Sequence, residues 1–492
     1  MRDRHRVAWL IVLAITAGAG PFVAGQARSV SYDVVVHGGR VIDPETGLDA
    51  VRDVGITGGR IAAISEQPLA GRSSLDATGL VVSPGFIDLH SHVNDDATYR
   101  LAALDGVTTA LELEMGVPDV AAFYARRNGR ALINYGTAAS HAWSRYAAYG
   151  GPPIDGALMP PSSKATDTPL GDGQWGALRR HLEQGLAEGG LAVGMGLVYT
   201  PGATRNEVID VFRLAAAHHV PVFVHTRSSG RTEPGSSIES VNEVIGAAAI
   251  SGAALHLVHI NSSCLADAPE CLRMIGGARA HGLDVTVEAY PYVAGMTDLK
   301  SAFFNPGWQQ RVGITEHEIA IPETGERLTP ASFARYRAQP APRLVLIYMN
   351  PQEVVDAVIR DPQTMIATDA VMQDGKGHPR AAGTFARVLA HYVRTERMLP
   401  LIEAVRKMSL MPAQRLETML PEARRKGRLQ VGADADIDVF DLATVSDRAT
   451  YTAPAEPSVG FRFVLVNGTL VVRDGQVLDA RPGRALRRQE GE

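Results

Sequence analysis

The chain of 492 residues contains little cysteine, little lysine and no large excess of either charge. Its two cysteines, Cys264 and Cys271, are too few for a cysteine-rich zinc site. Their spacing leaves two states open, a disulfide formed in an oxidising compartment or two small buried apolar side chains. The net charge of -5 gives no indication of a surface that binds nucleic acid. The basic stretch from Arg481 to Arg488 is interpreted as a solvated chain end rather than a binding arm.

Long apolar runs are also absent from most of the chain, so nothing beyond the N-terminal segment is predicted to span a membrane. The first residues differ, because three arginines among the first six positions precede an apolar run from Val7 to Ala17. Small residues follow as far as Ala27. This order is typical of a secretory signal peptide, so residues 1–27 are predicted to direct the protein to the periplasm or outside the cell. An uncleaved N-terminal membrane anchor is the alternative.

The remaining composition, 45% hydrophobic and 21% charged residues, is that of an ordinary globular protein. Residues 85–426 alternate short β-branched runs with helical stretches rich in alanine and leucine, which indicates parallel βαβ units. This length fits an α/β fold of the (β/α)8 TIM-barrel type. Residues 300–342 are rich in proline and weakly periodic, and we predict that they form an insertion over the mouth of the barrel.

Both ends of the chain carry short β-like runs that flank the predicted barrel. Residues 30–84 are punctuated by Gly38-Gly39 and Gly58-Gly59, and residues 427–478 contain Asn467-Gly468 between two such runs. An Asn-Gly pair in this position is a strong hairpin signal. Because the two segments flank one barrel, we expect them to build a single small β-sandwich domain together.

A histidine pair ends the first predicted barrel strand, in the stretch Phe86-Ile87-Asp88-Leu89-His90-Ser91-His92. Residues two apart on a strand share a face, so His90 and His92 point the same way and can hold one metal ion. Asp88 lies on the same face and is expected to orient a ligand.

Three further predicted strands end in residues that bind metals, namely His225, His259 and Asp369. Parallel barrel strands deliver their C-terminal ends to one mouth, so these side chains are expected to converge there. A single histidine at a strand end would be interpreted as a buried structural residue. Four histidines and one aspartate together predict a metal centre, and neutral imidazole is a common ligand of zinc.

These residues and their surroundings resemble the amidohydrolase superfamily and, within it, the N-acyl-D-amino-acid deacylase (D-aminoacylase) group. The likeness extends over about residues 32–476. The motifs that carry it are Gly85 to His92, Gly106-Val107-Thr108-Thr109, Gly196 to Gly202, His225-Thr226-Arg227, Tyr290-Pro291-Tyr292, His378-Pro379-Arg380 and Gly383-Thr384-Phe385. The resemblance implies a metal-dependent enzyme that hydrolyses an amide bond.

The resemblance also implies which residues act in the reaction. The implied metal ligands are His90, His92, His225 and His259. Asp369, next to the metal, would take a proton from the attacking water and pass it to the leaving amine. Tyr292 would polarise the scissile carbonyl or stabilise its oxyanion. His141, four residues before Arg145, matches a position of the group near the site.

Substrate binding is implied for four further positions, Tyr199, Arg227, His378 and Arg380. A guanidinium group can grip a substrate carboxylate with two hydrogen bonds, which suits Arg227 and Arg380. Structural ion pairs at the barrel rim are the alternative interpretation of these two arginines.

One position departs from the group's pattern. After Gly106 to Thr109 the pattern leads to a cysteine that ligates the metal, and Met115 stands near that place here. Methionine cannot supply an anionic ligand. The carboxylated lysine of other amidohydrolases has no counterpart either, because none of the five lysines ends a β-like run. A bridging glutamate is the expected substitute, with Glu114 preferred and Glu112 as the alternative. Such a bridge favours two zinc ions over one.

The sequence therefore predicts an exported zinc hydrolase that acts on a small molecule, either an N-acyl amino acid, D-configured in the group it resembles, or a dipeptide-like amide. Two alternatives keep the same barrel, a cyclic amidase or lactonase and a metal-binding or ligand-binding protein without catalysis. No nucleic-acid partner is expected, and a homo-oligomer is left open.

Overall fold

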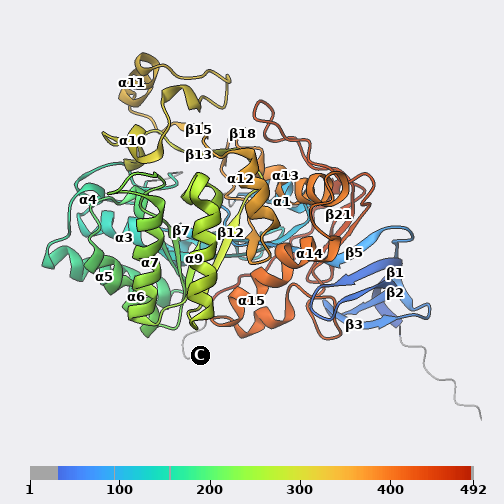
Figure 1. Cartoon of the computed structure of the whole chain (residues 1–492). Coiled ribbons are helices and arrows are strands. Elements are labelled where there is room, and N and C mark those ends of the chain that lie inside the picture. Colours follow the sequence, from blue (N-terminus) through green and yellow to red (C-terminus); the bar gives the residue numbers. More distant parts are fainter. Residues whose placement is uncertain (1–30, 93–94, 155–156, 489–492) are drawn as a thin grey trace, which may run out of the picture.

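The computed structural model describes residues 31–92, 95–154 and 157–488, and a barrel of eight parallel strands forms its centre (Figure 1). The predicted signal peptide, residues 1–27, lies outside the described residues. Among the residues that are described, every helix is too short or too polar to cross a lipid bilayer.

The barrel sheet has the strand order β16-β12-β11-β10-β9-β8-β7-β6. Its strands are β6 (Phe86–Asp88), β7 (Val107–Val117), β8 (Asn134–Ser140), β9 (Val193–Gly196), β10 (Val222–His225), β11 (Leu255–Leu257), β12 (Val285–Ala289) and β16 (Thr364–Ile366). A parallel bridge between Ser91 and Ala370 joins the two edge strands just beyond their C-terminal ends. The predicted (β/α)8 barrel is therefore confirmed.

Helices follow most of the barrel strands and cover the outside of the sheet. They are α1 (Asp96–Leu104), α2 (Val120–Arg127), α3 (His141–Ala148), α5 (Asp172–Ala187), α6 (Arg205–Ala217), α7 (Ser237–Ser251), α9 (Ala268–Ala280), α12 (Gln352–Arg360) and α13 (Arg380–Arg387). Side chains from different strands, such as Ile87, Leu111, Phe223 and Met365, pack together as one buried cluster. The barrel is thus a filled core, and the space for a ligand lies at its mouth.

A nine-stranded sheet beside the barrel is built from both ends of the chain. Its strands are β1 (Ser31–Asp43), β2 (Leu48–Thr57), β3 (Arg60–Ser65), β4 (Ala70–Asp76), β5 (Val81–Pro84), β19 (Ile437–Phe440), β20 (Phe461–Val466), β21 (Thr469–Arg473) and β22 (Gln476–Val477). The antiparallel pair β5 and β19 joins the two halves. Asn467 and Gly468, with φ of 49 and 77°, form the turn between β20 and β21. Two positive φ angles are those of the hairpin turn that Asn-Gly favours, as the sequence predicted.

A smaller antiparallel sheet rises from the barrel between β12 and β16, at the top of Figure 1. It has the order β13-β15-β14, with β13 (Ala294–Asp298), β14 (Ile319–Ala320) and β15 (Leu344–Tyr348). Two short helices, α10 (Trp308–Val312) and α11 (Pro330–Ala338), lie within this segment. Residues 294–349 are called the insertion segment below.

The two cysteines form a disulfide between α8 (Ile260–Cys264) and α9. This resolves the alternative that the sequence left open in favour of pairing. Since α8 begins directly after His259, the disulfide ties the segment that follows this candidate ligand to an outer helix of the barrel.

Candidate metal centre

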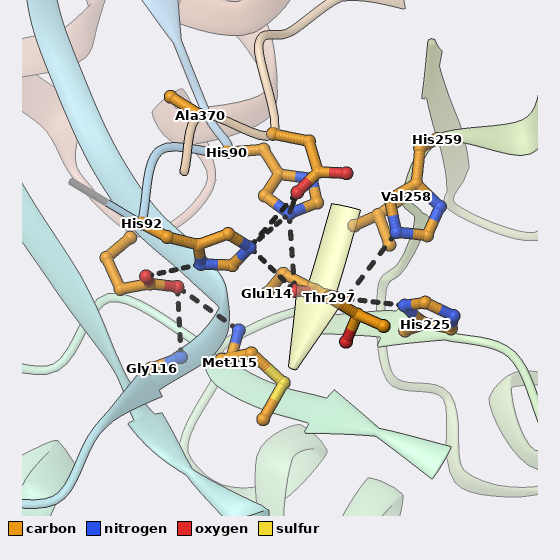
Figure 2. Close-up of polar contacts among 12 residues, drawn as sticks. His90, His92, Glu114, Met115, Gly116, His225, Val258, His259, Thr297 and Ala370 are labelled. Carbon is orange, nitrogen blue, oxygen red and sulfur yellow. Dashed lines mark hydrogen bonds and ion pairs between the residues drawn. The ribbon is translucent and has the colours of Figure 1, made fainter. Parts of the chain in front are cut away.

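The mouth of the barrel brings together the histidine and acidic side chains predicted at the strand ends (Figure 2). They are His90 and His92 after β6, Glu114 within β7, His225 at the end of β10, His259 after β11 and Asp369 after β16. Each lies on a barrel strand or within four residues of its end, and parallel hydrogen bonding fixes the place of that strand. The side chains therefore converge from five strands.

Glu114 lies between two pairs of histidines. Its Oε2 atom is 3.2 Å from His90 Nε2 and 3.1 Å from His92 Nε2. Its Oε1 atom is 2.8 Å from His225 Nδ1 and 3.5 Å from His259 Nε2. Burial alone would raise the pKa of Glu114, but the surrounding histidines hold it well below its usual range. One oxygen of an ionised carboxylate therefore faces each histidine pair, as a ligand shared by two metal positions would.

Asp369 contacts the same ring nitrogens from another side. Its Oδ1 atom is 3.4 Å from His90 Nε2 and 3.2 Å from His92 Nε2, and its Oδ2 atom is 2.8 Å from Arg380 Nη2. Burial would raise the pKa of Asp369, but Arg380 and the histidines lower it overall, so the carboxylate is ionised at neutral pH.

The backbone at two candidate ligands adopts left-handed conformations. Asp369 has φ of 50° and His259 has φ of 31°, which few residues other than glycine adopt. Conformations of this kind cost free energy and cluster at functional sites. Both residues leave their strands abruptly, which turns their side chains toward the shared centre.

The donor atoms fit a metal ion that prefers nitrogen and carboxylate ligands, such as zinc. Two groups offer one donor atom per residue within 4.8 Å of one another, His90 with Glu114 and His259, and His90 with His92 and Asp369. The Nε2 atoms of His90 and His92 are only 3.0 Å apart, so two ring nitrogens point at nearly the same place. A cation among these lone pairs and carboxylates would offset the electrostatic repulsion between them.

Glu112 supports the cluster from outside. Its Oε2 atom is 2.6 Å from His92 Nδ1, the ring nitrogen that does not face Glu114. Its Oε1 atom accepts the backbone N–H groups of Met115 and Gly116, both at 3.2 Å. The side chain of Met115 is buried in an apolar cluster with Tyr199 and takes no part in the site. The geometry therefore favours Glu114 as the bridge and gives Glu112 the task of orienting His92.

Glu288 holds His90 and is itself held by His256, two buried residues that the sequence analysis did not single out. Glu288 on β12 accepts from His90 Nδ1 at 2.6 Å and from His256 Nε2 at 3.1 Å. Burial would lower the pKa of His90, but Asp369, Glu114 and Glu288 raise it to about 10. A carboxylate behind a metal-binding histidine fixes the ring and increases its basicity. A glutamate inside the apolar run Val285–Ala289 is the sequence signal that would have revealed this pair.

Asp88 acts on the backbone rather than on a ligand side chain. It accepts from Thr368 Oγ1 at 2.5 Å, from the Thr368 backbone N–H at 3.0 Å and from the His90 backbone N–H at 3.2 Å. Burial raises the pKa of Asp88 to about 7. Asp88 thereby links the end of β6 to the segment of Asp369 and sets the relative position of two candidate ligands.

The structure does not bring His141 or Arg227 into the pocket beside these side chains. His141 Nε2 is 2.8 Å from Glu207 Oε1, and the same glutamate pairs with Arg145 at 2.5 Å. Arg227 forms two hydrogen bonds to Glu243, at 2.7 and 3.0 Å. Each of these side chains is thus paired with an acidic residue. The catalytic role of His141 and the substrate-binding role of Arg227 stay predictions.

The remaining predicted residues take different places. Tyr199 lines the pocket, and its hydroxyl accepts a hydrogen bond from Thr297 Oγ1 at 3.2 Å. Tyr292 is not among the lining residues, whereas Tyr290 is. The buried Tyr292 hydroxyl has no hydrogen-bond partner among the described residues. His378 accepts the backbone N–H of Arg380 at 3.0 Å. His378 therefore positions Arg380, whose guanidinium stacks on the Tyr290 ring at 4.5 Å.

Comparison with known proteins shows to which family this chain is similar. The amidohydrolase family model matches residues 249–472. D-aminoacylase of Alcaligenes xylosoxydans is 31% identical, over 94% of this chain and 99% of that protein. The solved N-acyl-D-glutamate deacylase of Bordetella bronchiseptica, a complex with zinc and a phosphonate inhibitor, matches with a TM-score of 0.78 and 26% identity. The match covers 93% of this chain and 100% of that one.

A solved D-aminoacylase with a binuclear metal centre gives the same TM-score of 0.78 and 26% identity, over 93% of this chain and 100% of that one. The resemblance that the sequence motifs suggested is confirmed by these matches, which extend over nearly the whole chain. On this ground the chain belongs to the amidohydrolases, in the group of the N-acyl-D-amino-acid deacylases.

Proposed function

We propose that this protein is a zinc-dependent hydrolase that cleaves the amide bond of N-acyl-D-amino acids. The observation that carries the proposal is the position of Glu114 between two histidine pairs, with Asp369 and Arg380 beside it. The relatives that share the fold are named for the same kind of substrate, as D-aminoacylase and N-acyl-D-glutamate deacylase.

Two zinc ions suit the donor set better than one. His90, His92 and Asp369 would hold the first ion, His225 and His259 would hold the second, and Glu114 would be shared. When bound, zinc supplies Lewis-acid chemistry, which polarises a carbonyl and lowers the pKa of water.

Asp369 is the residue best placed to move a proton. It lines the pocket, and its ion pair with Arg380 keeps its carboxylate ionised and ready to accept one. A carboxylate in this place accepts a proton from the attacking water and then donates it to the leaving nitrogen.

Arg380, which lies behind the pocket lining against Asp369 and Tyr290, is the residue that we assign to the substrate carboxylate. Its Nε and Nη1 atoms are buried without a hydrogen-bond partner among the described residues. A carboxylate beside them would satisfy both donors at once, in the paired geometry that guanidinium favours.

The test is hydrolysis by the purified, zinc-loaded protein. The substrates are N-acetyl derivatives of D- and L-amino acids, dipeptides, cyclic amides and lactones. We expect release of the free amino acid from the N-acetyl-D-amino acids, loss of this activity on treatment with a chelator, and recovery on addition of zinc. Cleavage restricted to dipeptides, cyclic amides or lactones would contradict the proposal, as would a lack of any hydrolysis.

The proposed place of action is outside the cytoplasm. The order of charged, apolar and small residues over positions 1–27 supports it, and so does the disulfide between Cys264 and Cys271, a bond that persists in oxidising compartments. Fusion of residues 1–27 to a reporter enzyme that is active only after export should give an active reporter. A reporter that stays inactive inside the cell would argue against export.

A further inference from the structure

The connection between β19 and β20 of the nine-stranded sheet extends away from its own sheet to α13 (Figure 1). Two backbone hydrogen bonds between Ser446 and Val459, at 3.0 and 3.1 Å, close the base of this loop. Its tip is a tight turn with two backbone hydrogen bonds between Thr450 and Ala453, at 3.1 and 3.2 Å. Residues 446–459 are called the arm below. A loop that is closed at its base and at its tip can hold a side chain in a defined place.

The arm is attached to α13, the helix that begins with Arg380. The Ser458 hydroxyl lies 2.9 Å from the carbonyl oxygen of Ala382. Asp447 accepts a hydrogen bond from Arg387 Nη1 at 3.2 Å. One contact lies in the first turn of the helix and the other at its end, so the arm follows the whole of α13.

The tip of the arm brings an aromatic ring, that of Tyr451, against His378. The two rings meet edge to face, with centroids 5.2 Å apart and planes at 83°. Tyr292 contacts the same imidazole edge to face, at 5.3 Å and 88°. The Tyr451 ring also lies 5.1 Å from the ring of Tyr348 in the insertion segment. Edge-to-face contacts between aromatic rings are favourable and directional, so these tyrosines restrict the rotation of the His378 ring.

His378 uses both of its ring nitrogens to hold the start of α13. Burial and the charge of Arg380 keep the pKa of His378 well below its usual range, so the ring is neutral, with one donor and one acceptor. Its Nε2 atom donates to the Ala294 carbonyl at 2.9 Å, and its Nδ1 atom accepts the backbone N–H of Arg380 at 3.0 Å. That N–H group lies in the first turn of the helix, where no carbonyl of the helix can accept it. The orientation of the imidazole therefore sets the position of Arg380.

The Arg380 guanidinium has little freedom to adjust if its backbone moves. It pairs with Asp369 Oδ2 at 2.8 Å and stacks on the Tyr290 ring at 4.5 Å. The two donors assigned to the substrate carboxylate, Nε and Nη1, lie on this same planar group. Both must point at the carboxylate for a paired interaction, so a small displacement of Arg380 weakens both hydrogen bonds together.

We propose that Tyr451 is a positioning residue for substrate binding, which acts through His378 to aim the Arg380 guanidinium at the carboxylate of an N-acyl amino acid. The inference rests on the proposed deacylase function and deepens it, because it gives a loop of the nine-stranded sheet a part in the site. The barrel supplies the metal ligands, and the arm keeps the carboxylate-binding group in register with them.

The experiment compares a substrate that has the carboxylate with one that lacks it. For the zinc-loaded protein, kcat and KM are measured with N-acetyl-D-leucine and with N-acetyl-D-leucinamide, and the ratio of the two kcat/KM values is called the carboxylate preference. In Tyr451→Ala the KM for N-acetyl-D-leucine should rise and the carboxylate preference should fall, each by about tenfold, because Arg380 is no longer aimed. The kcat/KM for the amide should stay within about threefold of wild type, since this substrate does not use Arg380.

A double-mutant cycle tests the route through Arg380. Tyr451→Ala should lower kcat/KM for N-acetyl-D-leucine by about tenfold in the wild-type background but by less than about twofold in an Arg380→Ala background, because both changes remove the same interaction. A general loss of structure would lower kcat/KM by the same factor in both backgrounds.

Two control variants lie at the tip of the arm. Tyr451→Phe keeps the ring and removes a buried hydroxyl that has no hydrogen-bond partner among the described residues, so it should keep the wild-type carboxylate preference. Thr452→Ala changes an exposed neighbour and should do the same. Tyr451→Leu is the second test variant if alanine prevents folding, and it should lower the preference by about threefold, because leucine fills space without the edge-to-face contact. Zinc content and circular dichroism establish that each variant is loaded and folded.

The outcomes separate the two claims. An unchanged carboxylate preference in folded Tyr451→Ala or Tyr451→Leu would overturn the role of the arm and leave the deacylase function standing. An equal loss on the acid and on the amide would make Tyr451 a purely structural residue and would overturn the inference as well. A loss in Tyr451→Phe as large as in Tyr451→Ala would exclude the ring contact as the cause. A lack of hydrolysis of every N-acetyl amino acid would overturn the proposed function and this inference with it.

Discussion

The pocket has a metal wall and an apolar wall, which are built by different parts of the chain. The metal wall consists of His92, Glu114, His225, His259 and Asp369, together with His90, which contacts Glu114. The apolar wall consists of Leu158, Met159, Met296, Phe303, Ile347 and Met349. The residues of the metal wall sit at the ends of barrel strands, and buried carboxylates such as Glu112 and Glu288 hold their rings. Four residues of the apolar wall come from the insertion segment, whose three strands form a sheet separate from the barrel. The difference teaches that the barrel fixes the candidate metal ligands, while an attached segment lines another side of the same pocket.

The largest effect is expected for Asp369→Asn on the metal wall. Asparagine keeps the shape of the side chain but cannot take up the proton, so kcat should fall by about a thousandfold. Steady-state kinetics, with zinc content as control, check this statement. A variant within tenfold of wild-type kcat would remove Asp369 from the proton-transfer role.

A second comparison is between two glutamates at the metal wall, through the variants Glu114→Gln and Glu112→Gln. Glu114 contacts both histidine pairs, whereas Glu112 contacts only His92 from behind. The first variant should lose zinc affinity by more than about 100-fold, and the second by about 10- to 100-fold, the range for supporting partners. Competition with a chromophoric chelator measures both. If Glu112→Gln lost the zinc and Glu114→Gln kept it, the assignment of the bridge would be wrong.

Much of the metal wall could be predicted because strand ends are visible in a sequence. His225 and His259 follow apolar β-like runs, and the parallel barrel converts that local position into a common site. Glu114 was predicted because the sequence has a methionine near the place where the group has a metal-binding cysteine. The structure places the Glu114 carboxylate between the histidines. For these residues the local sequence pattern and the barrel topology indicate the same site.

The apolar wall could not be predicted, because nothing local distinguishes Ile347 or Met349 from ordinary core residues. The segment was expected to be an irregular insertion, and only its antiparallel pairing turns these side chains toward the pocket. The same limit explains His141 and Arg227. A motif identifies the residue but not its hydrogen-bond partner. Tertiary structure pairs His141 with Glu207 and Arg227 with Glu243.

A third prediction concerns the residues behind the metal wall. Glu288→Gln retains an oxygen that can accept from His90 Nδ1 but removes the negative charge, so zinc affinity should fall by about 10- to 100-fold. His256→Gln, one step further from the ligand, should have a smaller effect. A cobalt-substituted enzyme would show an altered visible spectrum in Glu288→Gln if the ligand field changes. Equal zinc affinity in wild type and Glu288→Gln would make Glu288 a purely structural residue.

The smallest expected effect concerns pH, which should change the zinc affinity of the metal wall but not the substrate preference of the apolar wall. Carboxylates outweigh burial and raise the pKa of His90 to about 10, so in protein stripped of zinc this ring carries a proton at neutral pH. That proton stabilises the stripped protein fully below pH 6.5, and its contribution is lost as the pH rises through about 10.

Zinc must displace this proton and the proton of His92, whose pKa neighbouring carboxylates also raise against the effect of burial. Its apparent association constant should therefore rise by at least about tenfold for each pH unit over the range below the raised pKa values. The apolar wall contains no titrating group, so the ratio of kcat/KM between methionine and leucine substrates should stay constant over the same range. Chelator competition and kinetics at several pH values measure the two quantities. A zinc affinity that does not change with pH would mean that His90 is already neutral, and a drifting substrate ratio would mean that a charged group reaches the apolar wall.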